Sequence, residues 1–124
     1  EMCPVRIVAI KYKFDPCLKG VEQKTNVGPL QFVNLIMNAK YVITNSFHGT
    51  AFSLLFEKNF ITIRPMVFAG RLDSLLNLFC LVDRIVDKDD DIKKLEVPID
   101  YEKVRQKIDE FRNKSVLFLR ENLV

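Results

Sequence analysis

Cysteine is scarce in this sequence, which contains only Cys3, Cys17 and Cys80 among its 124 residues. Their number is odd, and their spacing fits neither a CxxC pair nor a cysteine–histidine ligand set. We therefore expect reduced thiols, as in a cytoplasmic protein, rather than a disulfide framework. We also expect no metal site and no cofactor.

The sequence also lacks a strong excess of charge of one sign and any long apolar run. Its 19 basic and 16 acidic residues leave a net charge of +3, which is too small and too scattered to favour nucleic acid as a partner. A transmembrane helix needs about 18 consecutive apolar residues, and no such run is present. The first residues lack the pattern of a signal peptide. We expect a cytoplasmic protein without a transmembrane segment.

The composition, 48% hydrophobic and 28% charged, is ordinary for a globular protein. A chain of this length buries about two thirds of its unfolded surface, so it can form a core without disulfides or metals. We find no internal repeat and no linker, and we expect a single α/β domain over residues 1–124. The sequence starts at Glu1 and soon enters an apolar segment, which we interpret as a piece of a longer protein.

Short apolar runs alternate with segments of helical periodicity. Strands are expected at residues 5–10, 41–44, 60–63 and 81–86, because these runs are short and rich in β-branched residues. Helices are expected at 29–38, 49–57, 71–79 and 101–123, and a loop at 14–28. This alternation predicts a Rossmann-like parallel sheet with helices on both faces.

The apolar stripes indicate which helix faces are buried. In the helix at 49–57 we expect Phe52, Leu55 and Phe56 to face inward. In the helix at 71–79 the residues expected to face inward are Leu72, Leu75, Leu76 and Phe79. The last helix should pack back on the domain along residues 104, 108, 111, 115 and 118. The charge run at 87–91 is expected to be a solvated loop.

The segment at residues 39–53 carries the chemical information, and it contains His48, the only histidine. In a parallel sheet, ligands bind beyond the carboxyl ends of the strands, where the turn after residue 44 lies. Free backbone N–H groups, the positive end of a helix dipole and Gly49 would suit an anion there. The alternative is that Asn45 and Ser46 only cap the helix and that His48 is a packing residue.

Residues 44–53, with the sequence TNSFHGTAFS, and residues 28–32, GPLQF, closely resemble the polysaccharide pyruvyl transferase family. Three later segments match that family in the same order: RLDSLL at 71–76, LVDRI at 81–85, and IDY at 99–101, which leads to Ser115, Phe118 and Leu119. The resemblance extends from about residue 26 to residue 123.

The resemblance implies a transferase that moves a pyruvyl group from phosphoenolpyruvate onto sugar hydroxyls, forming a ketal, in polysaccharide biosynthesis. It also implies a GT-B-like enzyme of two Rossmann-like halves with the phosphoenolpyruvate site in the cleft. This chain resembles the second half, whose partners would be phosphoenolpyruvate, a saccharide acceptor and the absent amino-terminal half. We expect the chain alone to be inactive, because a cleft enzyme needs both halves to orient donor and acceptor.

His48 is the expected catalytic residue, either as a proton donor or as a charge clamp for phosphate, because histidine exchanges a proton near neutral pH. Some family members have an arginine two positions before this histidine, where this sequence has Ser46. Its role could fall to Arg64 or Arg71, whose guanidinium groups suit carboxylate and phosphate, or to the missing half. The expected substrate-binding set is Asn45, Ser46, Gly49, Thr50, Arg64 and Arg71.

Two other functions stay open. A nucleotide-sugar glycosyltransferase of the same fold would need a carboxylate for the ribose hydroxyls, and Glu57 is the only acid nearby. A non-catalytic domain could keep the fold for binding or assembly. Arg84, next to Asp83, is expected to form a structural ion pair.

Overall fold

The computed structural model describes residues 5–87 and 89–123 of the chain. The chain forms two compact units, one up to residue 35 and one from residue 36 onward, and each is described by itself. Cys17 and Cys80 are free and exposed thiols, whereas Cys3 lies outside the described residues. No described helix has the length and apolar character needed to span a membrane.

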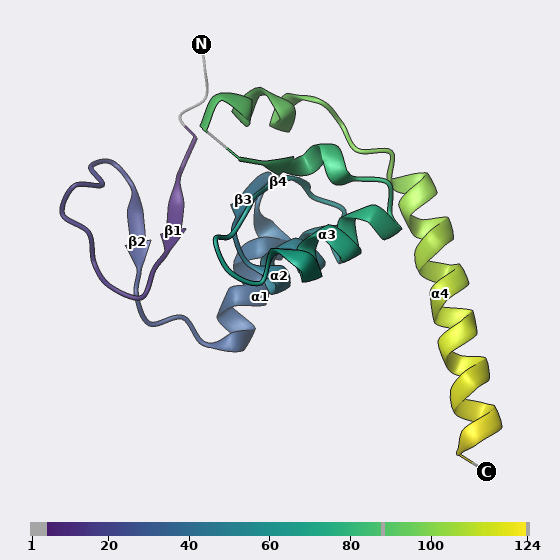
Figure 1. Ribbon diagram of the computed structural model, residues 1–124. Helices are drawn as coiled ribbons and strands as arrows, with labels where there is room; N and C mark the ends of the chain where they lie inside the picture. The colour runs from purple at the N-terminus through teal and green to yellow at the C-terminus, as the bar shows by residue number, and fades with distance from the viewer. Residues whose placement is uncertain (1–4, 88, 124) are drawn as a thin grey trace. The chain divides into compact units, whose positions relative to one another are not determined.

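The first unit contains a two-stranded parallel sheet of β1 (Val8–Ile10) and β2 (Glu22–Lys24) (Figure 1). The loop between them is held by Asp15, whose backbone N–H donates to Gln23 Oε1 at 2.8 Å and whose carbonyl accepts from Gln23 Nε2 at 2.7 Å. The expectation of a loop over all of residues 14–28 is therefore wrong. The polar sequence Glu-Gln-Lys of β2 shows neither β-branched residues nor alternation.

Helix α1 (Pro29–Asn38) leads from the first unit into the second. The second unit then alternates strands and helices: β3 (Tyr41–Thr44), α2 (Phe47–Leu55), β4 (Asn59–Ile63), α3 (Ala69–Leu78), the 3₁₀ segment η1 (Val82–Arg84), β5 (Ile85–Val86), the 3₁₀ segment η2 (Asp89–Glu96) and α4 (Tyr101–Asn122). Its three strands form one parallel sheet in the order β3-β4-β5. The expected α/β class and parallel pairing are confirmed, but the described strands form two sheets rather than one.

The core of the second unit lies on one face of this sheet. Phe60 of β4 is fully buried there, in one cluster with residues from α2, α3 and α4: Leu54, Leu76 and Val104. On the opposite face, Ile61 and Val86 pack on Leu95 of η2. In this unit α2, α3 and α4 thus share one face, and a short 3₁₀ segment contributes to covering the other.

Helix α2 starts at Phe47 rather than at residue 49, and it buries a different face than we expected. Leu54 is buried, whereas Leu55, which we expected to face inward, is 57% exposed. The buried side consists mainly of small residues: Gly49, Thr50, Ser53 and Leu54. Small side chains let the helix lie close to the sheet.

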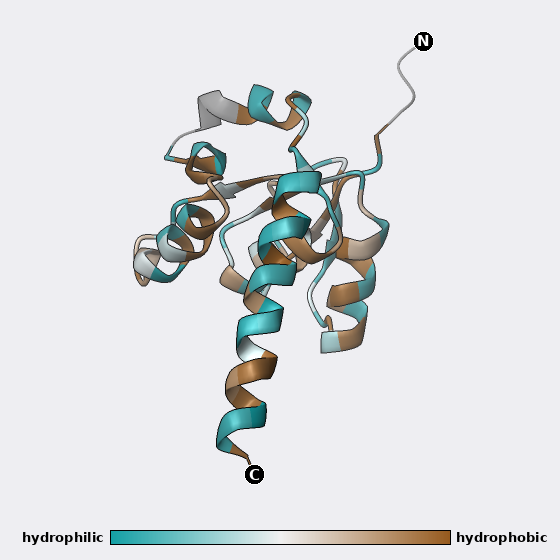
Figure 2. Cartoon of the chain, turned by 90° about the vertical axis from the view of Figure 1, so that its right-hand side faces the viewer, coloured by the Kyte–Doolittle hydropathy of each residue, from teal (hydrophilic) through white to brown (hydrophobic). Residues whose placement is uncertain are grey.

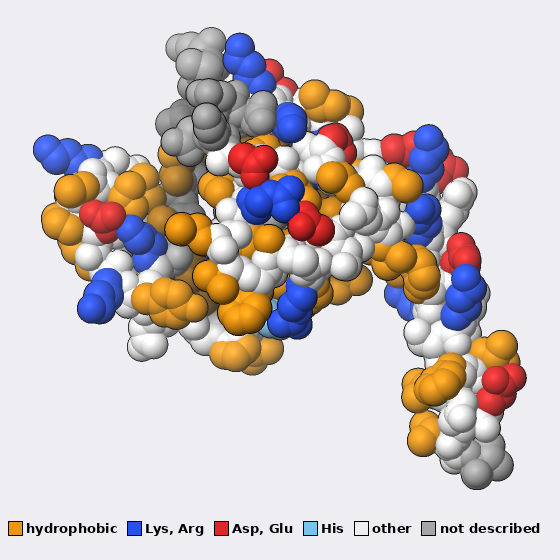
Figure 3. All heavy atoms as spheres, viewed as in Figure 1, with side chains coloured by type: hydrophobic (Ala, Val, Ile, Leu, Met, Phe, Trp, Pro, Cys, Tyr) orange, Lys and Arg blue, Asp and Glu red, His pale blue; other side chains and the backbone are white. Residues whose placement is uncertain are grey.

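Helix α4 packs on the core only through its first turns (Figures 1 and 2). Val104 is buried, but Phe118 is 63% exposed, and hydrophobic side chains gather at the projecting end of the helix (Figure 3). The expected packing of residues 115 and 118 on the domain is therefore wrong. The strand expected at 81–86 is reduced to β5, because residues 82–84 form η1. Part of the charge run at 87–91 lies outside the described residues.

Candidate functional site

The amino-terminal end of α2 is built by a cap that follows directly from β3. The backbone N–H of Ser46 donates to Thr44 Oγ1 at 3.1 Å, and Ser46 Oγ accepts from the N–H of Gly49 at 3.3 Å. The capping role expected for Ser46 is confirmed. Asn45 precedes the cap and is exposed. The helix therefore begins at the carboxyl end of a parallel strand, where ligands bind in α/β folds.

Gly49 and Thr50 lie on the inner side of this helix end. Thr50 is fully buried, its hydroxyl donates to the Ser46 carbonyl at 3.0 Å, and it pairs with Thr62 Oγ1 of β4 at 2.9 Å. A Cβ on Gly49 would lie 2.3 Å from Thr44 Oγ1. Both residues hold α2 against β3 and β4, so their positions favour a role in placing the site over contact with a ligand.

His48 stands on the opposite, exposed side of the first turn of α2. Its ring meets the ring of Phe47 edge to face, with centroids 5.8 Å apart and an interplanar angle of 89°. On the same Phe47 ring lies the guanidinium of Arg71, 4.9 Å from the centroid. Arg71 belongs to the first turn of α3, after β4, so Phe47 brings together two predicted site residues from successive strand ends.

Arg71 is exposed and, among the described residues, has no hydrogen bond or ion pair. The cation–π contact with Phe47 orients a guanidinium without neutralising it. Its five N–H donors stay available for a carboxylate or a phosphate. Arg71 is therefore the arginine of the predicted set that is best placed to bind an anion.

Arg64, the other predicted arginine, already forms ion pairs with two carboxylates. Its Nη1 contacts both carboxylate oxygens of Asp73 at 2.8 and 2.9 Å, and its Nε donates to Asp87 at 2.9 Å. The hydrogen bonds that Arg64 donates to Asp73 and, to a smaller extent, to Asp87 raise the pKa of Arg64. These ion pairs join the end of β4 to α3 and to the residue after β5. The geometry favours a structural role for Arg64.

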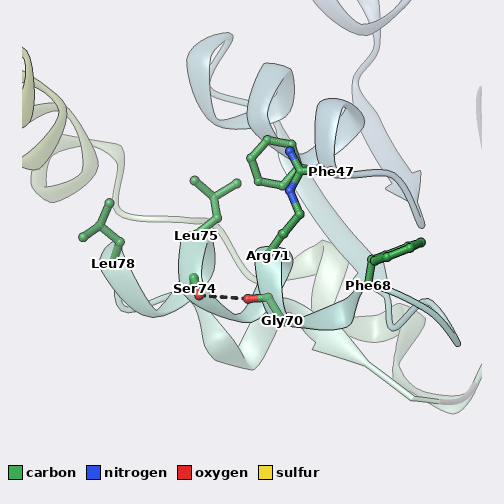
Figure 4. A pocket seen from close by; sticks show the side chains of 7 residues that line it. All are labelled: Phe47, Phe68, Gly70, Arg71, Ser74, Leu75 and Leu78. Atoms are coloured by element: carbon green, nitrogen blue, oxygen red, sulfur yellow. Dashed lines mark hydrogen bonds between the residues drawn. The ribbon is translucent and has the colours of Figure 1, made fainter.

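A hollow with a volume of ≈ 660 Å³ runs along the exposed side of α3, next to Arg71. It is lined mainly by apolar side chains, and Figure 4 shows Arg71 between Phe68 on one side and Leu75 and Leu78 on the other. Ser74 also lines the hollow, but its hydroxyl donates to the Gly70 carbonyl at 2.8 Å. Phe47 forms part of the wall.

Phe68 was not predicted as a residue of the site. This residue precedes α3 in a left-handed backbone conformation with φ of 61°, and its side chain is 82% exposed. A left-handed conformation cannot be predicted for a phenylalanine, because bulky residues rarely adopt it. An arginine at the start of a helix beside an exposed aromatic is the only available signal, and it is weak.

Two further residues considered in the sequence analysis form contacts within the fold. Glu57, the acid considered for a glycosyltransferase, lies beyond the carboxyl end of α2 and pairs with Arg105 of α4 at 2.9 Å. Arg84 is buried and donates to the carbonyls of Lys94 at 2.8 Å and Val97 at 2.7 Å, with Asp83 at 3.8 Å. The expected structural ion pair of Arg84 is present, but hydrogen bonds to the backbone are its closer contacts.

The model of the polysaccharide pyruvyl transferase family matches residues 5–65. This stretch includes His48 and the capping residues and confirms the resemblance there, while residues 5–25 extend it beyond the segment that we recognised. Arg71 and the later segments lie outside the match. Neither the comparison with curated proteins nor that with solved structures gave a match. Residues 5–65, just under half of the chain, are therefore similar to the polysaccharide pyruvyl transferase family.

Proposed function

We propose that this chain forms the donor site of a transferase that moves a pyruvyl group from phosphoenolpyruvate to two hydroxyls of a sugar. The observation that carries the proposal is the arrangement of His48 and Arg71 around the Phe47 ring. At the ends of two neighbouring parallel strands there are thus an imidazole suited to proton transfer and a guanidinium that has no ion-pair partner among the described residues. The match of residues 5–65 to the family model supports the reaction class.

Arg71 would hold the carboxylate or the phosphate of phosphoenolpyruvate in bidentate geometry. The exposed start of α2 adds backbone N–H groups and the positive end of a helix dipole nearby. Asn45 and Ser46, directly before the helix, would complete the anion contacts. Gly49 and Thr50 would act indirectly, by fixing the helix end to the sheet.

His48 would donate a proton to the methylene carbon of phosphoenolpyruvate, which becomes the methyl group of the product. The positive charge that develops at the adjacent carbon is taken up by the first sugar hydroxyl oxygen, and that hydroxyl gives up its proton. Phosphate then leaves with its bonding electron pair, and the second hydroxyl adds and loses its proton to close the ketal. An exposed histidine can carry the first proton and regain one from solvent.

We further propose that the chain is the carboxyl-terminal half of such an enzyme and has no turnover alone. The phosphoenolpyruvate site would lie on this half, as in a GT-B-like arrangement. Turnover also requires that a second half hold the acceptor in a reactive position relative to the donor.

Isothermal titration calorimetry of the chain tests the donor site directly. We expect saturable binding of phosphoenolpyruvate, no binding of a UDP-sugar, and a loss of at least about tenfold in affinity in Arg71→Ala, because a charge-assisted contact is removed. Arg64→Ala is the matched control, since its charge is already paired, and it should retain binding. Binding of a UDP-sugar instead would favour a nucleotide-sugar glycosyltransferase, and binding of neither would favour a non-catalytic domain.

A further inference from the structure

We propose that the hollow along α3 is a subsite for the sugar acceptor, with Phe68 as the residue on which the sugar ring packs. The inference rests on the proposed function and changes one part of it. The acceptor was expected to depend on the missing half, whereas this geometry places an acceptor contact on the present chain.

The position of the hollow relative to Arg71 supports this assignment. In ketal formation the hydroxyl oxygens must reach the carbon that bears the donor carboxylate, so the acceptor has to lie beside the group that holds this anion. Arg71 itself lines the hollow, and Phe68 flanks it (Figure 4). A sugar placed on Phe68 would therefore be next to a donor bound at Arg71.

The chemistry of the lining fits a sugar face better than a second anion. The walls are formed by Phe47, Phe68, Leu75 and Leu78, with Arg71 as the only charged side chain among the lining residues. A pyranose ring presents C–H groups on its face and hydroxyls at its rim. The C–H face packs on an aromatic ring, while the rim hydroxyls stay free for the reaction.

The backbone of Phe68 gives independent support. A phenylalanine at φ of 61° is an outlier, because the left-handed region favours glycine. Its ring gains little from burial, since it is 82% exposed. Residues held in sparsely populated backbone conformations cluster at active sites and ligand-binding sites. The conformation places an aromatic side chain at the hollow immediately before Arg71's helix.

The test is a titration of the ¹⁵N-labelled chain with methyl β-D-galactopyranoside and methyl β-D-glucopyranoside, followed by amide chemical shifts, with and without phosphoenolpyruvate. We expect saturable shifts at residues 68–78 for at least one of the two sugars. In Phe68→Gly the affinity should fall about tenfold, while the melting temperature stays equal or rises, because glycine relieves the left-handed backbone. Phe68→Tyr should retain binding.

Met66→Ala is the matched control, because Met66 is fully exposed in the same loop but does not line the hollow. It should leave the shifts unchanged. Absence of sugar shifts in both conditions, or unaltered binding in Phe68→Gly, would overturn the acceptor subsite. The phosphoenolpyruvate titration is read separately, so loss of the donor site and loss of the acceptor subsite are distinguishable.

Discussion

Thr44 Oγ1 occupies the space that a side chain on Gly49 would need. A Cβ built there lies 2.3 Å from this oxygen and 3.0 Å from Thr44 Cβ, closer than unbonded atoms approach. The threonine is not free to move away, because its hydroxyl accepts the N–H of Ser46 at the cap of α2. The first turn of the helix that carries His48 is thus fitted to β3 without a gap.

Gly49→Ala should therefore destabilise the fold. Overpacking of a tight site costs about 1–3 kcal/mol, which urea unfolding followed by circular dichroism would measure. Gly70→Ala is the control, because a Cβ on Gly70 meets nothing within 4 Å and alanine favours the helix. Equal stability of Gly49→Ala and Gly70→Ala would contradict the fitted contact with Thr44.

Replacing Arg64 and replacing Arg71 should change the melting temperature by different amounts. Arg64→Ala removes the ion pairs to Asp73 and Asp87 and should lower the melting temperature modestly, since these groups are partly solvent-exposed. Arg71→Ala removes only a cation–π contact with Phe47 and should leave the melting temperature nearly unchanged. The opposite order would mean that Arg71, not Arg64, is structural.

The elements that follow from a local sequence pattern were predicted from the sequence. The features that depend on packing or pairing between segments were not. The bounds of α1 and β3 follow from apolar periodicity and flanking signals, and they were predicted correctly. The buried face of α2 was not predicted correctly, because apolar residues lie on all sides of this helix. Contact with the sheet buries Leu54 and leaves Leu55 exposed. Strand β2 was not predicted, because its residues are polar and form a strand only through pairing with β1.

The site shows the same division. Ser46 as the cap of α2 follows from local residue preferences. The contact between Arg71 and Phe47 joins two successive helices across β4, and the parallel pairing of β3 with β4 brings their first turns together. Ion pairing of Arg64 could not be distinguished from ligand binding by residue type.

Arg84 should be one of the more sensitive positions for stability. It is 3% exposed, and its two terminal nitrogens bind the carbonyls of Lys94 and Val97, which hold η2 and the segment after it. Arg84→Met leaves both carbonyls without their donor and should cost about 2–4 kcal/mol. Chemical denaturation would measure this, with Arg112→Met on the exposed part of α4 as the control. A loss of stability in Arg84→Met no larger than in the control would show that the hydrogen bonds of Arg84 do not stabilise the fold.

Because the phenol of Tyr101 is largely buried, we expect the protein to lose stability at alkaline pH. Its hydroxyl donates to the carbonyl of Lys58, with the Ser53 carbonyl at 3.4 Å, and burial, partly opposed by Arg84, raises the pKa of Tyr101. Above a pH of about 10, the phenol value in the unfolded chain, the unfolded state releases a proton that the folded state retains. Stability present below this pH is therefore lost as the pH rises further.

Tyr101→Phe should be less stable than wild type by about 1–3 kcal/mol at neutral pH, because carbonyls lose a donor. Its melting temperature should fall less steeply between pH 9 and pH 11, chosen to span about one unit on each side of the free phenol value. Differential scanning fluorimetry across this range measures both effects. Parallel pH curves for the two proteins would show that the buried phenol does not control alkaline stability.

His48→Ala decides the central functional assignment, in a complete enzyme that carries this chain and turns over phosphoenolpyruvate. His48 is exposed and, among the described residues, its recorded contact is the edge of Phe47, so its removal should barely change the melting temperature. A proton donor contributes about 10²–10⁴ in rate, so kcat/KM for phosphoenolpyruvate should fall by that factor. Phe52→Leu, on the same helix but outside the site, is the control for folding. If His48→Ala lost thermal stability while its folded fraction kept near-normal kcat, the histidine would be a packing residue at the cap, and the proton donor would have to come from elsewhere in the enzyme.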